Sequence, residues 1–366
     1  MTGAPALFHV FSTFRVGGPQ VRFAAIANHF GDKYRHAILA MDGDYECLAR
    51  VASEVPVKQL NILVRKHDTL GSVFRFRRAL REQSTDLLVT YNWGAIEWAI
   101  ANRPRILPHV HIEDGFGPDE ADSQLLRRRL TRRFALSRSI VALPSRTLER
   151  AALRQWHLPK DRVRYIPNGI DCAKFTGRQA PIRFTQGCGP VIGTVAALRP
   201  EKNIARLLRA FRVVREKTAC RLLIAGDGQQ RGDLERLARA TLPAESVVFV
   251  GHVDAVERVY SSIDVFALSS DTEQMPTSVM EAMASGLPVV ATDVGDVAEM
   301  LTAENRAFVV SRDDEAFAGA LLKLVADASL RDALGSANQS AACARFGVSR
   351  MFADYDAVFA SEIGKS

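Results

Sequence analysis

Two successive series of short apolar segments, each followed by a stretch with helical periodicity, constrain the fold of this chain more than any other feature. The first series consists of the segments 6–11, 36–41, 86–91, 105–111 and 139–145. Alternation of strands and amphipathic helices indicates βαβ units that build a parallel sheet. The second series consists of the segments 190–198, 220–228, 246–253, 264–270 and 287–295.

The turn-forming sequence RYIPNGID at 164–171 separates the two series. A chain of 366 residues also exceeds the usual size of a single hydrophobic core. We therefore predict an α/β protein with two Rossmann-like, doubly wound domains, at 1–168 and 188–347, joined by a linker at 169–187. The apolar period of 348–363 predicts a C-terminal helix, about 348–366, that packs back on the first domain.

Charge and cysteine usage restrict the class of protein further. Residues 1–170 hold 26 Lys and Arg against 16 Asp and Glu, so the net charge of +7 is concentrated in the first domain. The five cysteines (Cys47, Cys172, Cys188, Cys220 and Cys343) have no metal-ligand spacing. Reduced thiols in a cytoplasmic protein without structural zinc are the simplest interpretation. We expect neither a signal peptide nor a membrane span.

The most informative segment is SSDTEQMPTSVMEAMASGLPVVATDVG at 269–295. It predicts a strand, a loop with Glu273, a helix that starts near Thr277, and a helix end at Gly286 in the C′ position. Free N–H groups at residues 275–278 would form a phosphate site, and Glu281, one turn further, would reach a ribose. The alternative is a capped surface helix with two solvated carboxylates.

The segment GTVAALRPEKN at 193–203 places Arg199 and Lys202 just after a strand. Two cations at the carboxyl end of a strand in an open α/β sheet can both face a diphosphate. The alternative is a solvated basic helix start.

Together these segments resemble the retaining GT-B glycosyltransferases of family four (glycosyl transferases group 1). The resemblance rests on Glu273-x7-Glu281 followed by ASGLPVVAT, on the R-x-x-K of Arg199 and Lys202, on AGDG at 225–228, on PNGID at 167–171 and on Gly17-Gly18. It covers nearly the whole chain. The family usually has glycine where this chain has Gln274, which leaves the identity of the sugar open.

The resemblance implies two domains that face a central cleft and a metal-independent transfer with retention of configuration. Catalytic roles are implied for His111, Glu273, Arg199 and Lys202. The implied donor site comprises Gly17, Gly18, Arg199, Lys202, Gly226, Glu273, Met275, Pro276, Thr277 and Glu281. A nucleotide diphosphate sugar, most simply a UDP-sugar, would be the donor, and no cofactor is implied.

On the first domain, the family resemblance points to a histidine at the end of the 105–111 strand. His111 fits best and His109 is the rival, with a satisfied core histidine as the alternative for either. Glu113 or Asp114 would orient an acceptor hydroxyl. Asn92 and Trp93, after the strand at 86–91, would line the acceptor pocket unless the tryptophan is buried beneath the sheet.

The tripeptide Asp42-Gly43-Asp44 matches a metal-binding DxD, but DG is also a common turn dipeptide, and we predict no metal site there. The segment 123–138 combines Leu126, Leu130 and Phe134 with five arginines. This pattern is typical of a helix that lies on an anionic membrane, or of a surface helix with its leucines in the core and its arginines in water.

The resemblance implies a hexosyltransferase that acts on a glycan or lipid-linked acceptor in envelope or exopolysaccharide biosynthesis, and we expect it to be cytoplasmic and peripheral on the membrane through 123–138. Nucleic-acid binding is not expected. A nucleotide-sugar epimerase, which changes the donor without an acceptor, and a non-catalytic nucleotide-sugar-binding protein are the alternatives.

Overall fold

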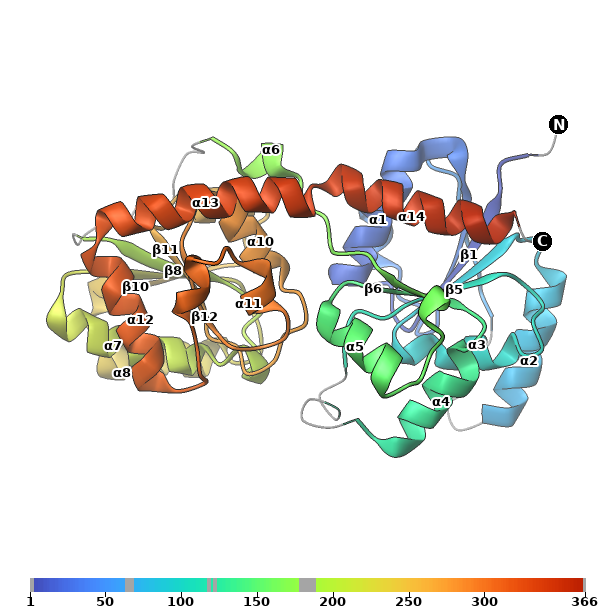
Figure 1. Cartoon of the computed structure of the whole chain (residues 1–366), viewed down its shortest axis with the longest axis horizontal. Coiled ribbons are helices and arrows are strands. Elements are labelled where there is room, and N and C mark those ends of the chain that lie inside the picture. The colour runs from blue at the N-terminus through green and yellow to red at the C-terminus, as the bar shows by residue number, and fades with distance from the viewer. Residues whose placement is uncertain (1–2, 63–68, 117–119, 121–123, 178–188, 365–366) are drawn as a thin grey trace. The chain divides into compact units, whose positions relative to one another are not determined.

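The computed structural model describes residues 3–62, 69–116, 120, 124–177 and 189–364. The chain forms two compact units (Figure 1). The N-terminal unit contains Met1–Pro167 and Ser349–Ser366, and the C-terminal unit contains Asn168–Val348. Cys188 and the predicted linker residues 178–187 lie outside the described residues.

Within the described residues, the N-terminal unit has a seven-stranded parallel sheet in the order β3-β2-β1-β4-β5-β6-β7. The strands are β1 (Ala6–Phe11), β2 (Arg35–Ala40), β3 (Val57–Gln59), β4 (Leu87–Tyr91), β5 (His109–Ile112), β6 (Ile140–Leu143) and β7 (Val163–Tyr165). The helices are α1 (Gly18–Phe30), α2 (Thr69–Glu82), α3 (Ile96–Ala101), α4 (Leu126–Leu136) and α5 (Arg146–Arg154). The C-terminal helix α14 (Val348–Ile363) returns to this unit, where Asp356 accepts hydrogen bonds from Lys33 and Tyr34.

The C-terminal unit repeats the arrangement, with six described parallel strands in the order β10-β9-β8-β11-β12-β13. They are β8 (Val191–Val195), β9 (Arg221–Ala225), β10 (Val247–Gly251), β11 (Val265–Leu268), β12 (Val289–Thr292) and β13 (Val309–Val310). The helices are α6 (Cys172–Phe175), α7 (Ile204–Lys217), α8 (Arg231–Thr241), α9 (Val256–Tyr260), α10 (Thr277–Ala284), α11 (Val297–Met300), α12 (Asp314–Ala326) and α13 (Ala328–Phe346).

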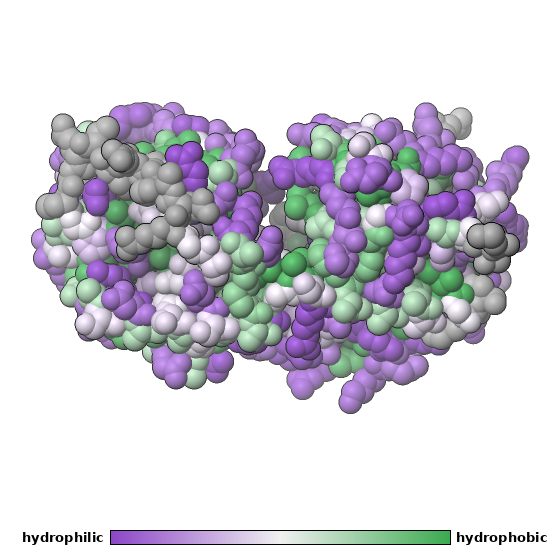
Figure 2. Space-filling view, turned by 90° about the horizontal axis from the view of Figure 1, so that it is seen from above, coloured by the Kyte–Doolittle hydropathy of each residue, from purple (hydrophilic) through white to green (hydrophobic). Residues whose placement is uncertain are grey.

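Alternation along the strands explains why helices cover both faces of each sheet. In β9, Leu222 and Ile224 point into one apolar cluster with α7 and α12, whereas Leu223 and Ala225 point into another with α10. Successive strand residues face opposite sides, so continuously apolar strands need a core on each side. This strand order is the Rossmann order, and the predicted fold class is therefore confirmed. Figure 2 shows that hydrophilic side chains with apolar patches between them cover the face in view.

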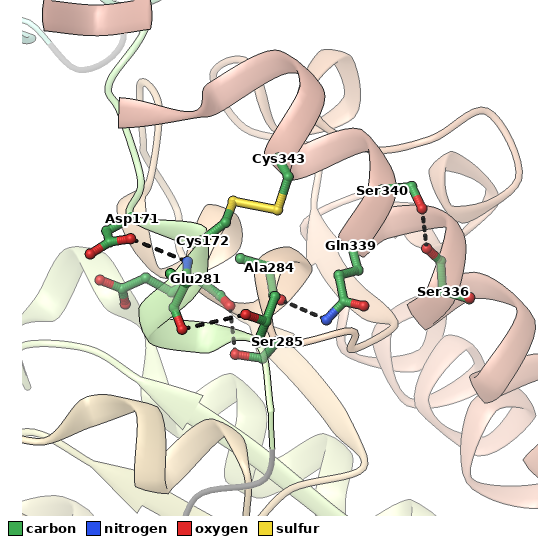
Figure 3. The surroundings of a disulfide bond; sticks show 11 residues. Asp171, Cys172, Glu281, Ala284, Ser285, Ser336, Gln339, Ser340 and Cys343 are labelled. Atoms are coloured by element: carbon green, nitrogen blue, oxygen red, sulfur yellow. Dashed lines mark hydrogen bonds between the residues drawn. A yellow bond between two sulfur atoms is a disulfide. The ribbon is translucent and has the colours of Figure 1, made fainter. Parts of the chain in front are cut away.

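The expectation that all cysteines are reduced thiols is wrong for one pair. Cys172 on α6 and Cys343 on α13 form a disulfide, with their Cα atoms 5.8 Å apart (Figure 3). They are separated by 171 residues in sequence, so their proximity follows from the fold and not from spacing. Cys47 and Cys220 are buried free thiols.

Candidate functional site

The candidate donor site of the C-terminal unit lies at the carboxyl ends of β8 and β11, which are neighbours in the sheet. Lys202 Nζ, beyond β8, donates a 2.5 Å hydrogen bond to Glu273 Oε1, beyond β11. Ser270 Oγ donates to the same oxygen at 2.7 Å. Two of the predicted site residues therefore form one ion pair. Arg199 is exposed, and no described carboxylate forms an ion pair with it.

A second layer of contacts fixes the turn at 199–203 against the loop that carries Glu273. Asn203, at φ +43°, caps α7 and donates from Nδ2 to Asp271 Oδ2 at 2.9 Å. Arg206, buried on α7, donates to Asp271 Oδ1 at 2.7 Å and to Ser269 O at 2.8 Å. Sequence reasoning missed Asn203, Arg206 and Asp271. The signal was an arginine among the apolar, core-facing residues of a predicted helix.

Helix α10 begins at Thr277, as predicted, and no side chain caps its N-terminus. Met275 and Pro276 are buried and Thr277 is exposed. The loop before the helix rests on Gly295, where a Cβ would lie 2.5 Å from Glu273 O and 2.6 Å from Gln274 O. The N-terminal N–H groups of a helix carry partial positive charge and need acceptors, so an anion can bind at this end. Gly295 is a second supporting residue that the sequence did not single out.

Glu281 occupies the first turns of α10 beside the ring of Tyr260. Tyr260 OH donates to Glu281 Oε2 at 2.7 Å, and Tyr260 is 1% exposed. Burial raises the pKa of Glu281, while the Tyr260 hydrogen bond and the charge of Lys174 oppose this shift. Phe175 of α6 packs edge-on against the Tyr260 ring. A carboxylate held in this way can accept hydrogen bonds from vicinal hydroxyls such as those of a ribose.

The structure gives a different reason for glycine at positions 226 and 286, and no steric reason for it at position 18. Gly226 lies at φ +127°, and a Cβ there would collide with Ala196 O, so the chain itself requires glycine at this position. Gly286 follows α10 at φ +74°, which confirms the predicted helix end. Gly17 caps α1 and Gly18 begins it, yet a Cβ at Gly18 would have no described atom within 4 Å outside its chain neighbours and the backbone of its own helix. Steric contact with other described segments therefore does not require glycine at position 18.

In the N-terminal unit, β4 and β5 place the predicted histidines in one buried chain of hydrogen bonds. Thr90 Oγ1 lies 2.8 Å from His109 Nε2 and 2.7 Å from His111 Nδ1. His109 Nδ1 contacts Ser139 Oγ at 2.7 Å. His111 Nε2 lies 3.4 Å from Glu113 Oε2. Both rings therefore lie on one face of the sheet, and His111 is the one next to the carboxylate.

The residues after β4 and β5 hold each other in place. Asn92, at φ +57°, accepts a 2.7 Å hydrogen bond from the backbone N–H of Asp114. Asp114 forms a pair of hydrogen bonds, 2.5 and 2.8 Å long, with the guanidinium of Arg22 on α1. Glu113 is fully buried. Arg22 is a further residue that the sequence did not indicate.

Trp93 is half-buried and faces two arginines of α4. The guanidinium carbons of Arg128 and Arg132 lie 4.9 Å from the centre of the Trp93 ring. Arg132 is fully buried, and it pairs with Glu120 and lies 3.4 Å from Glu113 Oε2. The alternative for 123–138 was a surface helix with its leucines in the core and its arginines in water. It is wrong, because Arg132 is in the core.

The apolar residues of that helix face outward. Leu126, Leu130 and Phe134 are 66%, 56% and 55% exposed, whereas Arg132 is 0% exposed. Residue 123 lies outside the described part of the chain.

The Asp42–Asp44 tripeptide forms a turn, with Gly43 at φ +80° and Asp44 paired with Arg15 at 2.6 Å. No described helix is long and apolar enough to cross a membrane.

The chain has two Rossmann-like units, and in the C-terminal unit two cations and a helix N-terminus lie at the carboxyl ends of the strands. These are features of GT-B glycosyltransferases. The family model described as "Glycosyl transferase 4-like domain" matches residues 17–169, and the model described as "Glycosyl transferases group 1" matches residues 189–327. The chain belongs to this glycosyltransferase family, as the resemblance predicted.

Among curated proteins, the chain is 29% identical to a GDP-mannose-dependent alpha-mannosyltransferase of Mycobacterium tuberculosis over 240 residues, 63% of this chain and 61% of that protein. It is 30% identical to an uncharacterized glycosyltransferase of Methanocaldococcus jannaschii over 199 residues, 51% of each chain. The chain thus spans about half the length of such relatives.

Solved structures share the fold over nearly the whole length. HepE of Anabaena in complex with UDP matches with a TM-score of 0.78 at 18% identity, over 98% of this chain and 100% of that chain. The sucrose-phosphate synthase of Thermosynechococcus elongatus matches with a TM-score of 0.79 at 18% identity, over 99% and 100%.

Proposed function

We propose that the protein transfers a hexose-type sugar from a nucleotide diphosphate sugar to a glycan or lipid-linked acceptor, with retention of configuration and without a metal requirement. The observation that carries the proposal is the pairing of Lys202 with Glu273 beside the uncapped start of α10. This arrangement offers a cation and free N–H groups to a diphosphate and a carboxylate to sugar hydroxyls. UDP is the expected nucleotide and GDP the second, because relatives or neighbours bind each of them.

The roles of individual residues follow from their charge and position. Arg199 and Lys202 stabilise the negative charge that develops on the leaving diphosphate, together with the start of α10. Glu281 binds the ribose and Glu273 the transferred sugar, and Gly226 contributes to the donor site through its backbone. His111 donates a hydrogen bond to a hydroxyl of the transferred sugar or stabilises the transition state, and Glu113 acts on the acceptor side.

A thermal-shift screen tests the donor site. We would titrate the wild type with UDP, GDP, ADP and their common sugar conjugates in the presence of EDTA. The expected result is stabilisation by one nucleotide that Arg199→Ala abolishes. Arg212→Ala is the matched control, since Arg212 is an exposed arginine on α7. The absence of any nucleotide effect on the wild type would contradict the proposal.

Product analysis separates transfer from epimerisation. A transferase releases the nucleoside diphosphate in proportion to added acceptor, whereas an epimerase converts the donor alone. Activity that persists in EDTA supports metal independence, and the anomeric coupling constant of the product reports retention or inversion.

We further propose peripheral association with an anionic membrane in envelope or exopolysaccharide biosynthesis. The apolar stripe of Leu126, Leu130 and Phe134 on α4, beside exposed Arg127 and Arg133, suits such a surface. Leu130→Ser should weaken co-sedimentation with vesicles that contain phosphatidylglycerol and leave nucleotide binding unchanged. Equal sedimentation of variant and wild type would contradict this part of the proposal.

A further inference from the structure

A small basic pocket lies in the N-terminal unit at the start of β5 and the end of α4, away from the strand ends that hold Glu113. Its cavity volume is only about 10 Å³, so a ligand larger than water would bind at its mouth and not inside it. Its polar lining consists of Asn102, Arg103, Arg105, Arg138, His109 and Ser139. Three of these six side chains are arginines, and neither the family resemblance nor the proposed activity gives them a role.

The charges in this pocket are incompletely compensated. Arg105 lies 3.4 Å from the buried carboxylate of Glu362, which Arg162 also approaches at 3.6 Å. Within the part of the chain that the structure describes, Arg103 and Arg138 have no carboxylate partner. The Arg103 guanidinium donates a long hydrogen bond, 3.4 Å, to Ser137 Oγ.

Two guanidinium groups in one pocket repel each other unless an anion lies between them. Burial and the charge of Arg138 both lower the pKa of Arg103, which shows that the two groups sense each other. The neutral lining groups have their own partners, since His109 contacts Ser139 and Asn102 binds the backbone at 106–107. The pocket therefore offers positive charge to an outside ligand, and a planar guanidinium fork is suited to phosphate.

The apolar stripe of α4 ends at this pocket. Phe134 is 55% exposed, and the guanidinium of Arg103 lies 5.2 Å from the centre of its ring. One turn and two turns earlier, Leu130 and Leu126 continue the stripe. A phosphate held by the arginines would place an attached hydrocarbon chain against these three side chains.

We propose that Arg103 and Arg138 bind the headgroup phosphate of an anionic phospholipid, whose acyl region lies against Phe134 and the α4 stripe. This inference rests on the proposed membrane association and adds a defined lipid site to it. The affinity of a diffuse basic surface for anionic lipid depends only on the number of its positive charges. The affinity of a defined site depends on which arginines are present.

The experiment compares two double variants that each remove two positive charges. Arg103→Gln/Arg138→Gln removes the pocket charges. Arg127→Gln/Arg133→Gln removes exposed charges of α4 outside the pocket. Binding is measured by co-sedimentation with phosphatidylcholine vesicles with and without phosphatidylglycerol. Arg138→Gln and Arg133→Gln are also tested singly, because both arginines are exposed and substitution of Arg138 removes no internal contact that the structure shows.

Diffuse attraction predicts that both double variants lose about fivefold in affinity per arginine. The site predicts a further loss of roughly tenfold or more for the pocket variant alone, and a loss for Arg138→Gln that exceeds that of Arg133→Gln. Equal losses in the two double variants would overturn the site and leave the membrane association of α4 intact.

Two other results would also overturn the site. If the wild-type protein does not bind anionic vesicles, both the lipid site and the membrane association are refuted. The nucleotide screen and the product analysis test the transferase activity independently. Thermal stabilisation by inorganic phosphate or glycerol 3-phosphate, lost in the pocket variant and without vesicle binding, would assign the pocket to a soluble anion.

Discussion

Replacement of Tyr260 by Phe removes one hydroxyl group from the support of the candidate ribose-binding carboxylate. Tyr260 OH donates to Glu281 Oε2 at 2.7 Å, and the tyrosine is almost fully buried. The same hydroxyl lies 3.3 Å from the carbonyl oxygen of Ser278. Phe fills the remaining volume, so the variant tests the hydrogen bond and not the packing.

The expected loss of stability follows from the charge of the acceptor. A hydrogen bond to a charged group contributes about 1.5–3 kcal/mol, against about 1 kcal/mol for a neutral pair. For a unit of this size, that loss corresponds to a drop of several degrees in Tm. Because the hydrogen bond opposes the rise that burial causes, the pKa of Glu281 should increase further in the variant.

The pH dependence gives the prediction its signature. A carboxyl group with a raised folded-state pKa disfavours the folded state progressively as pH rises through and above its unfolded value, about 4.3. The difference between Tyr260→Phe and wild type should therefore be largest at neutral pH. Below pH of about 4, where Glu281 is protonated in both proteins, it should shrink to that of a neutral hydrogen bond, about 1 kcal/mol.

Calorimetry is the suitable assay, because the three tryptophans (Trp93, Trp98 and Trp156) all lie in the N-terminal unit and would not report unfolding of Asn168–Val348. Isothermal titration with the nucleotide found in the screen measures affinity, which should fall about tenfold if Glu281 is displaced or protonated. Tyr45→Phe is the control, since the partners of Tyr45 OH are both neutral: it donates at 2.7 Å to the backbone oxygen of Leu60 and accepts at 3.2 Å from the backbone N–H of Ala40.

The control should lose about 1–2 kcal/mol at every pH, because both of its hydrogen bonds are to neutral groups, and it should keep its nucleotide affinity. If Tyr260→Phe behaves like Tyr45→Phe in both respects, the reasoning on Glu281 is refuted. A Glu281→Gln background provides a second check. There, the additional loss from Tyr260→Phe should not vary with pH, because no carboxyl group at 281 remains to titrate.

Three other expectations test the supporting structure. Burial lowers the pKa of His36 to about 4, so this residue alone should cost the N-terminal unit up to about 3 kcal/mol as pH falls from about 6.5 to 4. In urea titrations followed by tryptophan fluorescence, His36→Gln should reduce the pH dependence without abolishing it, because burial also lowers the pKa of His9 and of His109. Gly226→Ala should cost roughly 3 kcal/mol or more, whereas Gly319→Ala in α12, where a Cβ meets no atom within 4 Å, should raise stability by about 1 kcal/mol in calorimetry. Cys343→Ser should lower the calorimetric stability by up to about 5 kcal/mol under oxidising conditions, since the disulfide with Cys172 closes a long loop, and dithiothreitol should bring both proteins to the same value.

The sequence was sufficient for the elements that are long or strongly apolar. The strand at 6–11 has the predicted bounds, and the C-terminal helix, predicted at about 348–366, spans Val348–Ile363. The strands β3, β7 and β13 were not predicted, because they contain only three, three and two residues. Such short edge segments pair through their backbone, and their side chains, such as Lys58 and Gln59, carry no apolar alternation.

The sequence was sufficient to predict the residues of the candidate donor site themselves, but not the residues that support them. Lys202 and Glu273 each follow a strong strand signal, and parallel strands bring their carboxyl ends to the same edge of a sheet. The supports lay beyond this reasoning. Gly295 lies beneath the 273–274 backbone and Asp271 joins Arg206 only because of the tertiary fold. No periodicity within a segment records a partner that is far away in the chain.

Helix α4 shows why a sequence pattern identifies the faces of a helix but not their orientation. The apolar residues at intervals of four were recognised correctly, yet they face solvent while Arg132 is inside. The guanidinium of Arg132 lies within 4.9–5.6 Å of the ring centres of Trp93, Phe116 and Trp156 and pairs with Glu120. A buried charge is tolerated when it is paired and surrounded by aromatic faces, and these partners come from other segments. Because this compensation fixes the inward face, Leu126, Leu130 and Phe134 face outward, and this exposed stripe flanked by arginines is the observation that supports the proposed association with an anionic bilayer.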